Sequence, residues 1–200
     1  MVLNPGSTSF SSTPNECRSS VDLQKCPRCH LVSQANVGDT FDSRLYNYYA
    51  RYSGLPIEEV YNSTNTAGYL ELMRCFETLL KPLIDERLPD SLDVGCGHGQ
   101  FVFTACSNGW NARGIDLSES AIQVGKSFGV PIEARDVFDR SILPDSFDLV
   151  TMFEFIEHLS NPGRFLKRAE TIVRPGGIVY ITTPNFDSLE RRIIKKRVEA

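Results

Sequence analysis

Three glycines in the stretch Asp93-Val94-Gly95-Cys96-Gly97-His98-Gly99 have the spacing that most clearly points to chemistry in this chain. The stretch follows a short strand-like run and precedes a helix-like run that begins near Phe101. Glycine at such a turn lets the backbone approach a ligand where a Cβ atom would collide, and the N-terminus of the following helix directs its N–H groups at that ligand. The pattern predicts a nucleoside-type cofactor site, with an ordinary tight turn as the alternative.

An acidic residue, Asp116, lies nineteen positions after Gly97, at the end of a second strand-like run. A carboxylate placed there can accept hydrogen bonds from both hydroxyls of a ribose. The dinucleotide fingerprint G-x-G-x-x-G is not met, because position 100 is Gln and the third glycine is Gly99, and no Walker-type G-K-[ST] occurs. The spacing therefore favours an adenosyl ligand without a pyrophosphate over NAD or ATP.

Strand-like and helix-like runs alternate after residue 90, behind a helical apolar stripe from Tyr69 to Ile84. This alternation predicts βαβ units in an α/β fold, with a doubly wound, mostly parallel sheet of about five strands. Ligands of such sheets bind at the carboxyl ends of the strands. The expected strands are 91–96, 111–116, 131–136, 147–153 and 177–183, and the expected helices are 99–108, 119–128 and one that begins at Asn161-Pro162 and stops at Pro175-Gly176-Gly177.

Three polar side chains, Glu154, Glu157 and His158, form the pattern E-x-x-E-H directly after the fourth expected strand. Glu154 and His158 are four residues apart and would share a face if this stretch were helical. The three residues are candidates for a general base or a divalent-metal site. The alternative is structural, with His158 capping a helix and stabilising the loop.

These motifs resemble, as a set, the class I S-adenosylmethionine-dependent methyltransferases of a zinc-ribbon-linked, type-23-like group. Five blocks carry the resemblance in order between about Tyr69 and Leu189, namely LDVGCGHG, GIDLSESAI, ARDVFD, FDLVTMFEFIEHL and VRPGGIVYITTPNFDSL. The resemblance implies a Rossmann-like fold and an enzyme that moves a methyl group to O, C or N of a small molecule by in-line transfer.

The resemblance also implies which residues hold S-adenosyl-L-methionine. Asp93 and the glycine loop would take the ammonium of its methionine end, Asp116 the ribose, and Asp136 the adenine amino group. The full set of expected cofactor residues is Asp93, Gly95, Cys96, Gly97, Gly99, Asp116, Leu117, Asp136, Val137 and Phe153.

Cysteines near the N-terminus could bind zinc, because the resemblance suggests a zinc ribbon there. Cys26 and Cys29 form a C-x-x-C knuckle and Cys17 lies upstream, but position 14, where a fourth thiolate would belong, is Pro14. Structural zinc takes four ligands, so either His30 completes the set or the knuckle is a metal-free loop.

The chain is expected to divide into residues 1–40, a tail and zinc-ribbon-like knuckle, residues 41–90, a helical lid or packing segment, and residues 91–200, the methyltransferase domain. Members of the family continue with a last antiparallel strand pair that this chain lacks. We therefore expect the domain to be incomplete at its C-terminus, which leaves strand 177–183 at a sheet edge where chains can associate with one another.

Composition restricts the partners and the compartment. The net charge of −4 over 200 residues gives no general attraction to nucleic acid or to anionic membranes. The N-terminus lacks the features of a secretory signal, and scattered cysteines suit reduced thiols, so a cytoplasmic protein with a small-molecule acceptor is expected. The alternatives are a non-catalytic cofactor-binding remnant, a metal-assisted RNA methyltransferase and a dinucleotide oxidoreductase, the last disfavoured by Gln100.

Overall fold

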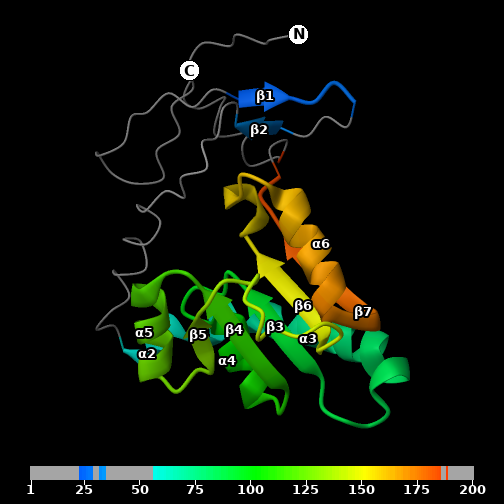
Figure 1. Ribbon diagram of the computed structural model, residues 1–200. Helices are drawn as coiled ribbons and strands as arrows, with labels where there is room; N and C mark the ends of the chain where they lie inside the picture. Colours follow the sequence, from blue (N-terminus) through cyan, green and yellow to red (C-terminus); the bar gives the residue numbers. More distant parts are fainter. Residues whose placement is uncertain (1–22, 29–31, 35–55, 186–187, 189–200) are drawn as a thin grey trace. The chain divides into compact units, whose positions relative to one another are not determined.

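The computed structural model describes residues 23–28, 32–34, 56–185 and 188 (Figure 1). The chain divides into two compact units, one made of residues 41–183 and the other of residues 1–40 with 184–200. In the smaller unit, strands β1 (Leu23–Lys25) and β2 (Val32–Gln34) pair antiparallel. The division of the chain into three segments that the sequence suggests stays a prediction.

The larger unit is built on a five-stranded sheet in the order β5-β4-β3-β6-β7, in which every neighbouring pair is parallel. Its strands are β3 (Asp90–Val94), β4 (Asn111–Asp116), β5 (Ile132–Ala134), β6 (Phe147–Phe153) and β7 (Val173–Thr182). The helices are α2 (Ile57–Val60), α3 (Ser63–Ile84), α4 (Gln100–Ser107), α5 (Glu119–Ser127), α6 (Pro162–Ile172) and the 3₁₀ turn η2 (Ile156–His158).

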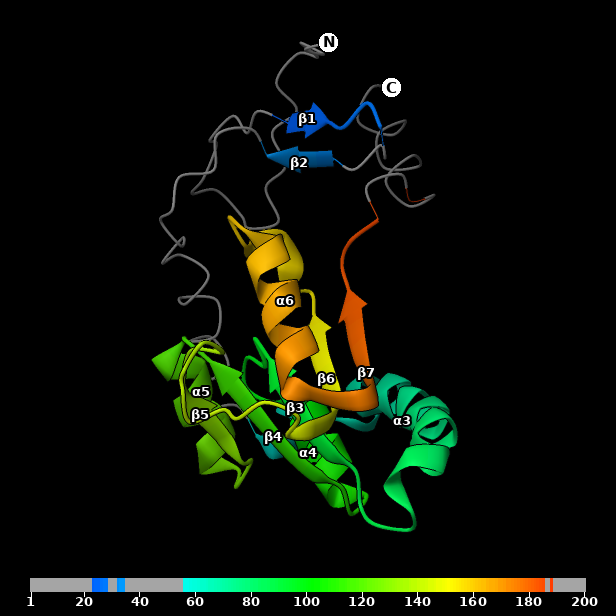
Figure 2. The same cartoon turned by 45° about the vertical axis from the view of Figure 1, so that its right-hand side comes forward.

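Helices cover both faces of this sheet, and the side chains of the central strands β3 and β6 are accordingly buried on both sides. On one face α3, α4 and α5 enclose a core centred on Leu80, Phe101 and Leu149. On the other face α6 packs over Leu92 and Val150, and Figure 2 shows α6 running alongside β6 and β7. The prediction of an α/β, doubly wound, parallel sheet is confirmed, and among the helices that the structure describes none has the length and hydropathy of a membrane-crossing segment.

The start of β7 differs from the prediction. Strand 177–183 was expected after a stop at Pro175-Gly176-Gly177, but the strand begins at Val173, which pairs with Phe147. The register shifts before Ile178 pairs with Leu149, so the Pro-Gly-Gly sequence forms an irregularity inside the strand, with Gly176 at φ 82°. Pro and Gly can mark such a bulge as well as a turn.

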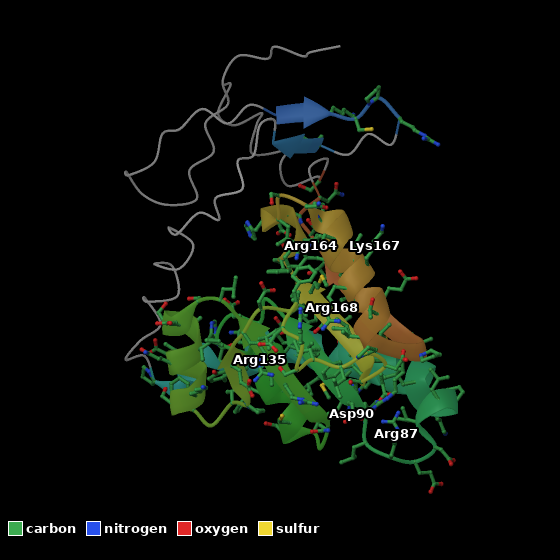
Figure 3. All side chains as sticks on the ribbon, viewed as in Figure 1. Arg87, Asp90, Arg135, Arg164, Lys167 and Arg168 are labelled. Atoms are coloured by element: carbon green, nitrogen blue, oxygen red, sulfur yellow. The ribbon has the colours of Figure 1, made fainter. Side chains whose placement is uncertain are left out.

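The amino ends of β3, β6 and β7 are joined by an ion-pair cluster around the buried Asp148, and Figure 3 labels its members Arg87 and Asp90. Asp148 accepts from both Nη atoms of Arg87, one of them at 2.6 Å, and from the Asp90 amide at 2.8 Å. Arg174 Nη1 lies 3.0 Å from Asp148 and 2.8 Å from Asp90. Burial by itself would raise the pKa of Asp148, but these hydrogen bonds outweigh it and hold the pKa below its ordinary value.

We expect Asp148→Asn to lower the free energy of unfolding by about 1–2 kcal/mol at pH 7, because a buried neutral amide cannot serve two guanidinium groups. A carboxyl with a lowered folded pKa stabilises the protein above its unfolded pKa of about 4 and loses that contribution as the pH falls through the folded value. Urea unfolding should therefore give a lower free energy of unfolding for Asp148→Asn than for the wild type at pH 7. Below about pH 4 the two values should become similar. The exposed Asp145, changed to Asn, is the control, and equal losses in both variants would contradict this role.

Candidate active site

The glycine loop leaves the end of β3 in a conformation that glycine favours. Gly95, Gly97 and Gly99 have φ angles of 74°, 55° and 84°, all in the left-handed region. The amide of Gly95 donates to the Ile115 carbonyl at 2.9 Å, which ties the start of the loop to β4. Gly99 then caps α4, so the loop presents backbone rather than side chains at the carboxyl end of the sheet.

Asp116, the last residue of β4, is hydrogen-bonded to this loop. Its Oδ2 accepts from the Gly97 amide at 2.9 Å, and its Oδ1 accepts from the Ser118 amide at 2.7 Å. Burial raises the pKa of Asp116, while these backbone donors act in the opposite direction. The local hydrogen bonds therefore hold the carboxyl group in a fixed orientation between the glycine loop and α5.

A cavity of about 120 Å³ opens at this end of the sheet. Half of the ten predicted cofactor residues line it, together with two of the three predicted catalytic residues. These wall residues are Gly95, Asp116, Leu117, Asp136, Val137, Glu154 and His158. The other predicted residues, which do not line the cavity, are Asp93, Cys96, Gly97, Gly99, Phe153 and Glu157.

The cavity is restricted by Phe155, a residue that the sequence did not single out. A Cβ atom built on Gly95 would lie 2.1 Å from Cδ2 of Phe155, so the phenyl ring rests directly on the glycine backbone. The ring also packs edge-on against Phe165 of α6, with centroids 5.7 Å apart. Because small-molecule pockets usually measure about 300–1,000 Å³, this cavity holds only part of a nucleoside cofactor while the ring of Phe155 stays in place.

Asp93 does not line the cavity and is almost completely buried, with an exposed fraction of 3%. Its Oδ1 accepts from the Thr151 hydroxyl at 2.7 Å. The pKa of Asp93 is raised to about 7, because burial and, to a smaller degree, the charge of Asp116 raise it more than the Thr151 hydrogen bond lowers it. A cation placed beside the carboxyl group would favour its ionised form.

Tyr69 reaches the same corner from α3, and sequence reasoning missed it because it was counted only as an apolar position of the helical stripe. Its ring packs edge-on against Phe153, the last residue of β6, with centroids 5.1 Å apart. The pKa of Tyr69 is raised to about 12, chiefly by burial and in addition by the charges of Asp93 and Glu154. The phenol therefore lies within electrostatic range of two predicted site residues.

The three predicted catalytic residues follow β6 in a different arrangement from the helix that was considered. Only the 3₁₀ turn Ile156–His158 forms, and the Glu154 amide donates to the Thr182 carbonyl of β7 at 3.2 Å. The His158 Nε2 lies 4.0 Å from the Glu157 carboxylate. Glu154 and His158 face the cavity, so these two keep the place that a general base would need.

Metal binding finds no support in the part of the chain that the structure describes, where no three His, Cys, Asp or Glu side chains come close enough to share an ion. The metal alternative for Glu154, Glu157 and His158 therefore lacks a ligand set. Of the predicted zinc ligands, Cys26 is partly buried near β1, whereas Cys17 and Cys29 lie outside the described residues.

The segment before α3 contacts the glycine loop, which the sequence did not reveal. The Gln100 side chain donates to the Val60 carbonyl at 2.7 Å, and the Tyr61 hydroxyl donates to the His98 carbonyl at 2.8 Å. Gln100, which occupies the position of the third glycine in a dinucleotide fingerprint, thus anchors the glycine loop to the segment before α3. Of the predicted lid, residues 41–55 lie outside the described residues.

Comparison with known sequences finds relatives for most of the larger unit. The Methyltransf_23 family, a methyltransferase domain, matches residues 67–199. A ubiquinone biosynthesis O-methyltransferase of Chromobacterium violaceum is 36% identical over 101 residues, which cover 47% of this chain and 44% of the relative. One from Ralstonia nicotianae is 34% identical over 109 residues, covering 51% and 44%. The chain spans less than half the length of these curated relatives.

Solved structures share the fold. A protein of Pyrococcus horikoshii, PH0226, superposes with a TM-score of 0.52 at 22% identity, covering 76% of this chain and 68% of the other. A SAM-dependent methyltransferase of Archaeoglobus fulgidus gives 0.51 at 24% identity, covering 68% and 60%. At these identities the likeness concerns the fold alone. Together with the match over residues 67–199, it confirms the resemblance drawn from the sequence, and the chain belongs to the class I methyltransferase domain family Methyltransf_23.

Proposed function

We propose that this chain binds S-adenosyl-L-methionine and transfers its methyl group to O, C or N of a small molecule. The observation that carries the proposal is Asp116, whose two oxygens are aligned by backbone donors from the glycine loop and the α5 cap while its side chain forms part of the cavity wall. That placement suits a ribose diol, and family membership makes the adenosyl group the first ligand to consider.

The remaining cavity residues fit the other half of the nucleoside. Leu117 and Val137 provide apolar surface for a purine ring, and Asp136 uses one oxygen, Oδ1, to accept from the Phe138 amide at 2.9 Å. Its second oxygen can accept from an exocyclic amino group. Arg135, labelled in Figure 3, also lines the cavity, but it is held in an ion pair with Glu133 at 2.6 Å.

In the proposed reaction the bound cofactor supplies a methyl group that its sulfonium already activates, so the protein mainly aligns the acceptor with the methyl carbon and the sulfur. Transfer to the acceptor would replace the carbon–sulfur bond of the cofactor by a bond to the acceptor atom, with S-adenosylhomocysteine as the second product. An acceptor O–H or N–H gives up its proton, for which His158 and Glu154 are the candidates at the cavity wall. Because the curated relatives are named O-methyltransferases, hydroxyl acceptors are the first to test.

Calorimetry with S-adenosylhomocysteine and transfer of a labelled methyl group to a panel of hydroxyl-bearing small molecules test this function. If the role of His158 is that of a base, we expect His158→Ala to lower turnover about 100-fold or more while the affinity for S-adenosylhomocysteine stays unchanged. An equal loss of folding stability would favour the structural alternative for His158. Binding without turnover on any acceptor would favour the non-catalytic remnant, and no binding would refute the proposal.

Self-association through the outer strand of the sheet stays part of this proposal. β7 ends the strand order, and its Val179 side chain is 36% exposed. Among the strands that the structure describes, none pairs with the outer edge of β7, and an unpaired strand edge can pair with another chain. Sedimentation of the wild type beside Val179→Lys would show whether association occurs and whether it uses this strand.

A further inference from the structure

We propose that Arg168 of α6 is a positioning residue, which fixes segment 137–142 and thereby the part of the cavity wall that would meet the base of the cofactor. That part of the wall is formed by Asp136 and Val137. The inference rests on the proposed function, because it concerns recognition of the same ligand. It gives this task to a side chain that does not itself line the cavity.

Segment 137–142 follows β5 and contains no helix or strand. Its carbonyl groups therefore lack the partners that a sheet ladder or a helix would give them. Val137 and Ile142, at its two ends, are both buried. Because buried backbone carbonyl groups are almost always hydrogen-bonded, the conformation of this segment depends on donors from another element.

The guanidinium group of Arg168 supplies these donors. Its Nε donates to the Val137 carbonyl at 2.8 Å, and its Nη2 donates to the carbonyls of Ile142 at 2.6 Å and Asp139 at 3.2 Å. The donors of a guanidinium group lie in one plane and point in fixed directions. One side chain therefore joins both ends of segment 137–142 and its middle in a single geometry.

Two further side chains of α6 pack against the same segment. The guanidinium group of Arg164 lies over the ring of Phe138, 4.0 Å from its centroid, and Phe165 packs edge-on against that ring with centroids 5.0 Å apart. Arg164 and Arg168, both labelled in Figure 3, are four positions apart and so lie on the same side of the helix. Helix α6 is thus the support of the segment, and Arg168 makes the polar contacts to its backbone.

The segment that Arg168 holds is continuous with the cavity wall. Val137 lines the cavity, and the Oδ1 of the neighbouring Asp136 accepts from the Phe138 amide at 2.9 Å. Because this amide belongs to the segment, a shift of the segment would move the Asp136 carboxylate with it. The direction of its second oxygen, which is proposed to accept from the exocyclic amino group of the base, therefore depends on Arg168.

The test compares S-adenosylhomocysteine with S-inosylhomocysteine, in which a carbonyl oxygen replaces the exocyclic amino group of the base. The wild type should prefer S-adenosylhomocysteine at least about tenfold, because Asp136 would face an acceptor instead of a donor. In Arg168→Met we expect this preference to fall to about twofold or less, chiefly through a higher dissociation constant for S-adenosylhomocysteine, since a displaced carboxylate loses the hydrogen bond that distinguishes the two bases. Arg168→Lys keeps the charge but not the planar fork, so the preference should fall there as well.

Lys167→Met is the matched control, because it removes a positive charge from the adjacent, exposed position of α6. Its preference for S-adenosylhomocysteine should equal that of the wild type. Urea unfolding of every variant measures the contribution to folding separately, and if Arg168→Met does not fold, Arg168→Lys alone decides.

Other outcomes would overturn the proposal. A lower free energy of unfolding with an unchanged preference in both Arg168 variants would show that the side chain only supports the fold. A loss of preference in Lys167→Met as large as that in Arg168→Met would show a general effect of charge. Wild-type protein that binds neither ligand would refute the proposed function itself, whereas wild-type protein that binds both equally well would refute only the recognition of the base that Arg168 is proposed to support.

Discussion

Asp116→Ala is expected to raise the dissociation constant for S-adenosylhomocysteine by roughly 5- to 150-fold, which corresponds to about 1–3 kcal/mol of binding free energy. The ribose hydroxyls would lose their acceptor, and the Gly97 amide would lose its partner at 2.9 Å. Both effects act on the part of the site that would contact the ribose. Isothermal titration of the wild type and the variant measures the difference directly.

Asp139→Ala is a matched control for this change. Asp139 also accepts the amide of the residue two positions later, at 2.7 Å from Ser141, just as Asp116 accepts from Ser118. It does not line the cavity, so its loss removes the same local hydrogen bond without touching the ligand. An Asp116→Ala variant that binds as tightly as the wild type, or an equal loss in the Asp139 variant, would show that Asp116 does not hold the ribose.

The parts of the fold that depend on local signals were predictable from the sequence. The strand predicted at 111–116 is β4 with the same bounds, and Ser118 caps α5 by accepting the Ala121 amide. The side chain of Asn161 likewise accepts from the Arg164 amide at the start of α6. Caps and alternating apolar residues act within a few positions, so a single sequence carries them.

The start of β7 could not be predicted in this way, because it depends on residues far apart in the chain. Pro175-Gly176-Gly177 is a turn signal, yet Arg174 lies beside it and pairs with Asp90, which is 84 positions earlier. Pairing of Val173 with Phe147 on β6 then continues the sheet through the bulge. Contacts of this separation leave no periodic pattern in the sequence.

The same distinction applies to the candidate site. The glycine loop and Asp116 were found because their types and spacing are local. Tyr69 and Phe155 were missed because each becomes part of the site only through a partner about 60 or more residues away, Phe153 for Tyr69 and Gly95 for Phe155. Their residue types are ordinary for a core, so only the folded structure separates them from packing residues.

Removing the ring of Phe155 is the second large expected effect, and here binding should become tighter. The ring lies where a cofactor chain crossing Gly95 would have to pass, so the full cofactor can enter only after this side chain has moved. Displacing a partly buried phenylalanine that packs on another ring costs about 2 kcal/mol. If the alanine variant avoids that cost, the dissociation constant for S-adenosylhomocysteine should fall about 30-fold.

The comparison that isolates this effect again uses two ligands and a second aromatic residue. 5′-Methylthioadenosine lacks the chain that crosses Gly95, so its affinity should barely change in Phe155→Ala. Phe165→Ala removes the other ring of the same aromatic pair and also opens the cavity, but Phe165 does not cover the glycine, so its effect on the two ligands should be equal. Weaker binding of S-adenosylhomocysteine to Phe155→Ala would show instead that the ring forms a wall of the occupied site, because removal of a ring that only blocks the ligand cannot weaken binding.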